Sequence, residues 1–308
     1  NDRARKSQKK CQPPGRHKPQ IGELPSRVQS ARRRIASRVV KIRRSCQPFR
    51  PMVRQLGQTT LGIVRDTGDF TLFCGRAFLS LSKTRRLPRR ILRAVYEQGA
   101  VCLPVIAIVG VFTGLVLGLQ GYHVLSRFGS EGLLGTLVSL SLVREMAPVL
   151  AALMLVGQAG SAFAAELGIQ RNTEQIAALE TMGVNSLGYL VAPRLIAALL
   201  VFPAQAALFV VLGLWGGSLS GSVLLGVDSG VYWSAVERAV EFRDLRECFL
   251  KAASFGVLTT SICAYMGFHA DRNTSSAGAR AVSASTTRAV VFSSITVLVA
   301  DYVISSFF

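Results

Sequence analysis

The sequence predicts an all-α integral membrane protein with an N-terminal interfacial amphipathic helix, five transmembrane helices and a short cytoplasmic helix between two of them. Half of the 308 residues are hydrophobic and only 17% are charged. The hydrophobic residues form continuous runs rather than the alternating pattern of a β-barrel strand. Runs of about 20 residues match a hydrocarbon core of about 30 Å at a rise of about 1.5 Å per helical residue. Composition and run length together therefore predict membrane-spanning helices.

Five apolar segments are long enough to cross a bilayer, at residues 99–123, 133–164, 188–224, 248–269 and 286–308. The segment KTRRLPRRILR, residues 83–93, immediately precedes the first of them and carries six basic residues and no acid. Positively charged flanks remain on the cytoplasmic side. We therefore expect a cytoplasmic N-terminus and, after five crossings, a periplasmic C-terminus.

Residues 1–51 form a basic tail. They hold 16 of the 36 Lys and Arg residues and only two acids, Asp2 and Glu23, so much of the net charge of +19 lies here. This polar composition cannot bury a core and predicts a disordered segment. A basic tail is suited to anionic lipid or nucleic acid. The globular pattern begins after Met52, and we expect Met52 to be the native start and the tail a translated upstream extension.

The segment between the tail and the first span, residues 52–98, mixes apolar and polar residues at helical spacing. Leu61, Val64, Leu72 and Phe73 are predicted to share an apolar surface. This pattern is typical of a helix lying in the membrane interface, and packing against the bundle is compatible with it. The remainder, residues 99–308, is the predicted transmembrane domain.

Small residues recur at every fourth position in two spans. The first span carries Gly110, Gly114 and Gly118, and the third carries Gly213, Gly217 and Gly221. Such faces let helix backbones approach closely in lipid. The pattern predicts tight helix packing, either within one chain or across a dimer.

The loop between the second and third spans carries a short helix. Asn172 or Thr173 is predicted to cap its N-terminus with Glu174 or Gln175 completing the capping pattern, and Gly183 fits the position after its C-terminus. Ile176, Leu179 and Met182 form an apolar stripe. The helix either packs on its own bundle or docks into the groove of a partner.

Two adjacent charges, Arg144 and Glu145, lie near the middle of the second span. Adjacent helical positions point about 100° apart, so the two side chains cannot face each other well and need other partners. Lys251, in the fourth span, is a predicted partner of Glu145, and Pro148 is predicted to kink the helix and widen a cavity. Intramembrane charges of this kind usually line a functional site, here a polar patch suited to an amphiphile with a charged head group.

Motifs of independent catalysis are absent from the sequence. No Lys follows a Gly, so there is no phosphate-binding P-loop, and no H-E-x-x-H or G-x-S-x-G occurs. The six cysteines show no C-x-x-C spacing, which argues against a metal site. We expect no enzyme activity and no cofactor on this chain.

The run VREMAPVLAALMLVGQAGSAFAAELG, followed by RNTEQIAALETMGVN, YLVAPR, GLWGGSLSG and SSAGARAVSASTTRAVV, resembles the MlaE family of ABC-transporter permeases. The similarity covers residues 53–308. It implies a phospholipid permease of the Gram-negative inner membrane that works as a homodimer with two cytoplasmic ATPase subunits carrying ATP-Mg. It also implies a periplasmic hexamer of MCE-domain lipid-binding proteins and a small STAS-domain protein as partners.

The resemblance assigns roles to particular residues. The loop helix at 173–182 would be the coupling helix that docks on the ATPase, with Asn172, Glu174, Ile176, Leu179, Glu180, Met182 and Gly183 as its residues. A lipid pocket at the dimer interface would contain Glu145, Lys251, Arg144, Leu117, Leu125 and Phe128. Phe128 stands where some members have Tyr, so a hydroxyl contact there is not expected.

Two other functions remain open from the residues. A self-contained secondary transporter or channel would use Arg144, Glu145 and Lys251 as an ion relay and would need no ATPase. A membrane-tethered nucleic-acid binder would act through residues 1–51 and show salt-dependent DNA binding. The resemblance favours the permease, with phospholipid and not nucleic acid as its ligand.

Overall fold

The computed structural model describes residues 65, 67–77, 79, 87–270 and 278–307. The chain divides into two compact units, Asn1–Asp66 and Thr67–Phe308. Apart from Arg65, the first unit lies outside the described residues, and so do the predicted tail at 1–51, Leu61 and Val64. All labelled helices belong to the second unit.

The described part of the second unit is helical and contains no strand. Its α-helices are α3 (Leu87–Val95), α4 (Leu103–Leu125), α5 (Leu134–Ser141), α6 (Ala147–Leu155), α7 (Ser161–Asn172), α8 (Gln175–Thr181), α9 (Ser186–Leu190), α10 (Ala192–Ser218), α11 (Ser229–Ala239), α12 (Phe242–Phe268) and α13 (Ala279–Phe307). Short π-helical segments interrupt or extend them at Tyr96–Ala100, Leu142–Met146, Val156–Gly160 and Leu219–Leu224, and 3₁₀ turns lie at Ser126–Phe128 and Glu131–Leu133.

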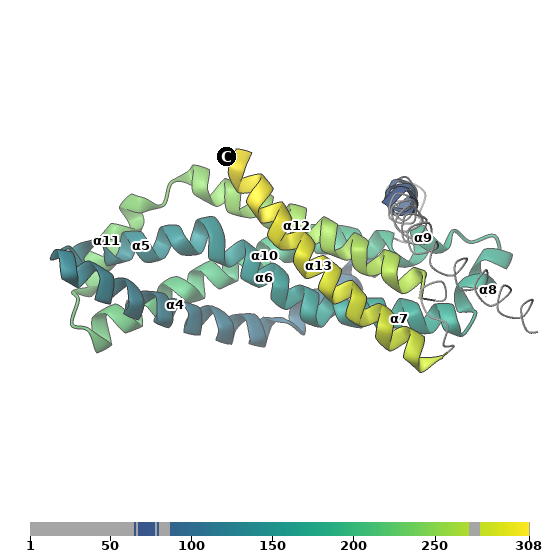
Figure 1. Cartoon of the computed structure of the whole chain (residues 1–308), viewed down its shortest axis with the longest axis horizontal. Helices are drawn as coiled ribbons and strands as arrows, with labels where there is room; N and C mark the ends of the chain where they lie inside the picture. Colours follow the sequence, from purple (N-terminus) through teal and green to yellow (C-terminus); the bar gives the residue numbers. More distant parts are fainter. Residues whose placement is uncertain (1–64, 66, 78, 80–86, 271–277, 308) are drawn as a thin grey trace, which may run out of the picture. The chain divides into compact units, whose positions relative to one another are not determined.

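Five continuous helical stretches within the described residues are long and apolar enough to cross a membrane. They are Pro88–Phe128, Glu131–Asn172, Ser186–Leu224, Phe242–Phe268 and Ala279–Phe307. The all-α fold and the five spans predicted from the sequence are confirmed. Most stretches extend beyond the predicted limits, because their polar ends continue the helix past the apolar run. Figure 1 shows α8 and α11 at opposite ends of the helical bundle.

Helices α4 and α10 pack against each other through the predicted glycine faces. A methyl group placed on Gly114 would lie 1.9 Å from the carbonyl oxygen of Gly213, and one on Gly118 would lie 3.0 Å from that of Gly217. Gly110 faces the backbone of Phe209 on α10 in the same way. The glycines therefore allow backbone contact within one chain, which resolves the choice left open by the sequence for this pair of helices.

Gly217 and Gly221 also make room for neighbours other than α4. A methyl group on Gly217 would lie 2.7 Å from the Tyr232 hydroxyl, and one on Gly221 would lie 3.0 Å from Leu134. The Tyr232 hydroxyl donates to the carbonyl of Leu214 at 3.2 Å. Burial raises the pKa of Tyr232, so the phenol remains protonated and keeps this bond at neutral pH. This contact attaches α11 to α10 at the end of the bundle far from α8.

Residues 67–77 are helical, and one side of this segment packs on α12. Phe73 is buried and lies edge-on to Tyr265, with ring centroids 5.6 Å apart. Leu72, in contrast, is 60% exposed. Phe73 therefore packs against the bundle and Leu72 points away from it, because adjacent helical residues point about 100° apart. The interfacial position of this helix stays a prediction.

Candidate functional site

The intramembrane charges lie on a π-helical segment, Leu142–Met146, between α5 and α6. Pro148 follows at the start of α6 and has no N–H to donate to the carbonyl four residues earlier, which is that of Arg144. That carbonyl instead accepts a hydrogen bond from the Lys251 ammonium at 2.8 Å. The proline thus frees a backbone acceptor inside the membrane, and a charged side chain from α12 binds it.

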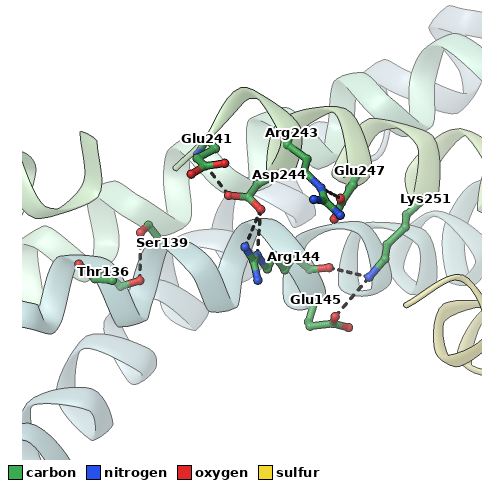
Figure 2. Close-up of polar contacts among 9 residues, drawn as sticks. All are labelled: Thr136, Ser139, Arg144, Glu145, Glu241, Arg243, Asp244, Glu247 and Lys251. Atoms are coloured by element: carbon green, nitrogen blue, oxygen red, sulfur yellow. Dashed lines mark hydrogen bonds and ion pairs between the residues drawn. The ribbon is translucent and has the colours of Figure 1, made fainter. Parts of the chain in front are cut away.

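Lys251 is the buried centre of the cluster, with 4% of its surface exposed. Besides the Arg144 carbonyl, its ammonium donates to the Ser305 hydroxyl at 2.7 Å and to the Glu145 carboxylate at 3.3 Å. The Asp301 carboxylate lies 3.5 Å away, within ion-pair distance. An ammonium has three N–H groups, and three acceptors bind them. The predicted pairing of Lys251 with Glu145 is present in the structure (Figure 2).

Arg144 points to a different partner. Its guanidinium contacts the Asp244 carboxylate at 2.9 Å, while Glu145 turns toward Lys251 (Figure 2). Asp244 is buried and lies in the first turn of α12, where it also forms a capping box with Glu241. Asp244 therefore fixes both the start of α12 and the direction of Arg144.

A cavity of about 380 Å³ opens beside these charges. Its polar lining consists of Arg144, Glu145, Glu241, Arg243, Asp244, Glu247, Lys251 and Ser305. The Glu145 and Arg144 side chains are about half exposed, at 52% and 55%, whereas Lys251 is at 5%. Glu145 and Arg144 are therefore accessible from the cavity, as is Arg243 at 63%, whereas Lys251 is enclosed and contacts the Glu145 carboxylate and the Arg144 backbone carbonyl.

The apolar residues that the resemblance places in a lipid pocket do not line this cavity. Leu117 lines a neighbouring groove of about 450 Å³ on α4, which Met146 also contacts. Leu125, near the end of α4, packs partly buried against the core. Phe128 is 77% exposed. One chain therefore brings together Arg144, Glu145 and Lys251, and leaves Leu117, Leu125 and Phe128 on a separate surface.

The loop helix α8 has the predicted C-terminus. Gly183 adopts φ +74°, its N–H donates to the carbonyl of Glu180 at 3.0 Å, and the N–H of Val184 donates to that of Leu179 at 3.0 Å. These two bonds form a Schellman motif, in which a glycine in the left-handed conformation ends the helix. The prediction for Gly183 is confirmed.

The predicted N-terminal cap of α8 is wrong. Asn172 is the last residue of α7, and the Thr173 hydroxyl donates back to the carbonyl of Ile169 at 2.9 Å. The capping position is occupied by Glu174, which has φ 57° and makes no side-chain capping bond. The preceding helix α7 thus takes the residues that would otherwise cap α8.

The apolar stripe of α8 has one buried and one exposed end. Ile176 is fully buried, Leu179 is half-buried, and Met182 is 68% exposed. Glu180 accepts a hydrogen bond from the Ser186 hydroxyl at 2.9 Å, which ties α8 to α9. The helix therefore packs on its own chain through Ile176 and presents Met182 outward.

Arg194 connects both ends of the α8 loop to the bundle, and sequence reasoning missed it. It pairs with Glu166 on α7, lies 3.5 Å from Glu97 near α3, and stacks over Phe163 at 4.5 Å. Its side chain is only 13% exposed. Arg194 therefore joins α7, α10 and the segment after α3 at the base of the α8 loop. Arg194 follows a proline at the start of α10, and nothing at this position of the sequence indicates that its partners are Glu166 and Glu97.

Sequence reasoning also missed Asp244, Asp301 and Ser305, which complete the charge cluster. Each lies on a helix other than that of Arg144 and Glu145, and no spacing rule relates them. An acid within an apolar span, such as Asp301, is the one signal that could have been followed. No group of three His, Cys, Asp or Glu side chains suited to a metal ion occurs among the described residues.

Comparison with known proteins identifies relatives of this chain. The family model described as Permease MlaE matches residues 91–307. The intermembrane phospholipid transport system permease protein MlaE of Haemophilus influenzae is 38% identical over 255 residues, which cover 82% of this chain and 96% of the relative. A probable ABC transporter permease protein of Rickettsia bellii is 36% identical, covering 83% and 97%. The chloroplastic protein TRIGALACTOSYLDIACYLGLYCEROL 1 of Arabidopsis thaliana is 30% identical, covering 77% and 66%. With its five spans and its matched family model, the chain belongs to the MlaE family of permeases.

Proposed function

We propose that this chain is the permease subunit of an ABC transporter that moves phospholipids between the inner and outer membranes of a Gram-negative envelope. The observation that carries the proposal is the open cavity between Arg144 and Glu145 in the second span and the start of α12, with accessible charges of both signs and an apolar groove that Leu117 and Met146 line. A phospholipid has this combination of a charged head and long apolar chains. The Haemophilus relative, described as a phospholipid transport permease, supports the same substrate class.

The lipid site is proposed to form between two copies of the chain. Arg144 and Glu145 would contact the head group, Lys251 would hold Glu145 in position, and Leu117, Leu125 and Phe128 would contact acyl chains. Phe128 is exposed and Leu117 borders an open groove, so both surfaces are available to a second protomer. The homodimer would bring the charged cavity of one copy near the apolar surface of its partner.

The energy is proposed to come from ATP-Mg hydrolysed on separate cytoplasmic ATPase subunits. Helix α8 would be the coupling helix, since it exposes Met182 and is held to the bundle by buried Ile176 and the Glu180–Ser186 bond. Arg194 at the base of the loop would transmit its displacement to α7 and α3. An MCE-domain hexamer on the periplasmic side and a STAS-domain protein on the ATPase would complete the assembly.

The proposed lipid site can be tested with a photo-crosslinking amino acid placed at Leu117 or Leu125. Cells grown with radioactive phosphate should yield labelled protein from both positions. Leu250 on α12 is 50% exposed and lines neither cavity, so it serves as the control for contact with bulk lipid. Labelling at Leu117 and Leu125 no stronger than at Leu250 would contradict the site.

A secondary transporter is the alternative function for the same charges. The chain belongs to a permease family, and its relatives include probable ABC transporter permeases. This membership does not favour a secondary transporter. An ion relay would also require charges that change partners, whereas Lys251 is enclosed by four partners in the structure.

A further inference from the structure

The cavity at the charge cluster has an excess of acid. Its lining contains three basic side chains, Arg144, Arg243 and Lys251, and four acidic ones, Glu145, Glu241, Asp244 and Glu247. Asp301, which contacts Lys251, adds a further carboxylate behind it. The local charge is therefore negative, although the chain as a whole is strongly basic.

Every basic side chain of the lining already has an acidic partner. Arg144 is paired with Asp244, Arg243 with Glu247 at 2.9 Å, and Lys251 with Glu145. Lys251 has in addition no spare N–H, because the Arg144 carbonyl and the Ser305 hydroxyl take the other two. A lipid phosphate cannot bind the Lys251 ammonium without displacing one of these acceptors. Lys251 is therefore a positioning residue for Glu145.

Glu145 and Arg144 are adjacent in sequence and about half exposed. The other exposed charges of the lining are Arg243, which is paired with Glu247, and Glu241, which caps α12. The Arg144 contacts with Asp244 run through Nε and one terminal nitrogen, and a guanidinium has further N–H groups that can meet a phosphate. Glu145 presents a carboxylate, which is complementary to an ammonium. The pair thus offers one cationic and one anionic contact in the lining of one cavity. Figure 2 shows Arg144 directed toward Asp244 and Glu145 toward Lys251.

From this balance of charge we infer that the cavity selects zwitterionic head groups, with the lipid phosphate on Arg144 and the lipid ammonium on Glu145, over anionic head groups that lack an ammonium. The inference rests on the proposed lipid-transport function and names the substrate class of the same site. A head group with a phosphate alone would meet only arginines that already pair with carboxylates, Arg144 and Arg243, in a cavity with an excess of acid. It would add no cation to Glu145, whose partners are Lys251 and Ser305. A zwitterion offers an anion to Arg144 and a cation to Glu145, and leaves the net charge of the cavity unchanged.

The test is a competition between two lipids for the purified full-length chain. Protein in detergent is incubated with equal amounts of phosphatidylethanolamine and phosphatidylglycerol of identical acyl chains, and the lipid retained after gel filtration is quantified by mass spectrometry. The wild-type chain should retain the ethanolamine lipid in excess by about fivefold or more, the scale of one favourable charge contact. Equal retention of both lipids would overturn the selectivity and leave the lipid-transport proposal standing. Retention of neither lipid would contradict both.

Two variants assign the selectivity to residues. Glu145→Gln keeps an oxygen for Lys251 but removes the charge, and should bring the ratio of retained lipids close to one. Glu131→Gln, an exposed acid far from the cavity lining, makes the same change of charge and should leave the ratio at the wild-type value. An unchanged ratio in Glu145→Gln would overturn the inference.

Arg144→Gln gives an independent signature should Glu145→Gln not fold. Because both lipids carry the phosphate, this variant should lower the retention of both and keep their ratio. A fall in the ethanolamine lipid alone would show that Arg144 does not contact the phosphate, and would contradict the assignment.

Discussion

At the scale of single residues, Lys251 shows how a charge is held at the middle of a transmembrane helix. Removing an ammonium from water is costly unless its donors and its charge are both satisfied. Here a proline-freed carbonyl, a hydroxyl and two carboxylates satisfy them. Lys251 is in turn the cation that Glu145 and Asp301 share, so the carboxylates of the cluster need the lysine to remain buried there.

Replacing Lys251 by Met should destabilise the protein by about 3–5 kcal/mol, because Glu145 and Asp301 would lose their shared cation. The measurement is the unfolding free energy in detergent. Arg246→Met on the same helix removes an exposed positive charge and should change stability by less than about 0.5 kcal/mol. Equal effects of the two substitutions would contradict the central role of Lys251.

The sequence predicted the Glu145–Lys251 pair because each was a charge without an obvious local partner in an apolar span. It did not predict Asp244 as the partner of Arg144, since the two are 100 residues apart and Asp244 lies at a helix start, where an acid is expected for capping alone. Asp301 is an acid in an otherwise apolar span and could have been noticed, but nothing in its spacing names Lys251 as its partner; Ser305 is one of several small polar residues of that span. Distant pairings of this kind follow from packing and leave no local pattern.

At the scale of elements, the glycines of α4 and α10 bring the backbones of these two helices into contact. The fourfold spacing of glycines was sufficient to predict a close-packed face. The partner helix could not be predicted, because glycine faces in lipid fit each other within a chain or between chains alike. The cap of α8 was mispredicted for a related reason, because α7 continues through the residues that resembled a cap.

Gly114→Ala should destabilise the bundle by about 3 kcal/mol, since its methyl group would overlap the backbone of Gly213 and backbone atoms cannot move aside cheaply. Gly157→Ala is the matched control, because a methyl group there meets no atom within 4 Å. It should be neutral or stabilise by up to about 1 kcal/mol. Thermal unfolding in detergent compares the two. A Gly114→Ala protein as stable as Gly157→Ala would refute the close packing.

Met182→Asp tests the proposed docking of α8. Met182 is an apolar side chain that is 68% exposed, so the substitution should leave the fold intact. It should weaken an apolar contact between α8 and the ATPase. ATP-dependent lipid transfer should fall by about tenfold or more, as expected for the loss of one central interface contact. Glu180 is less suitable for this test, because it braces α8 through Ser186.

The matched control for Met182→Asp is Val231→Asp on α11, at the opposite end of the bundle (Figure 1), where the side chain is 43% exposed. This variant makes a similar apolar-to-acid change and should retain binding to the ATPase. Co-purification of the ATPase measures binding directly. Full ATPase binding and transfer by Met182→Asp would exclude Met182 from the interface.

At the scale of the whole molecule, the chain has two distinct surfaces, a charged cavity within the spans and an exposed loop helix at one end. Arg194 and the helices α7 and α10 connect them. The number of spans and the family followed from hydrophobic runs and from the quoted motifs. The separation of Leu117, Leu125 and Phe128 from the charges did not, because it depends on how distant helices pack; it is what the proposed site between two protomers would require.

The most direct test of the account is lipid transfer by the chain reconstituted into donor vesicles together with its cognate ATPase. The account predicts transfer of a fluorescent ethanolamine phospholipid to an acceptor only when both the ATPase and ATP-Mg are present, and a fall of about fivefold or more in that transfer in Glu145→Gln. Transfer of ions or lipid by the chain alone, driven by a gradient and indifferent to the ATPase, would contradict it and establish a secondary transporter.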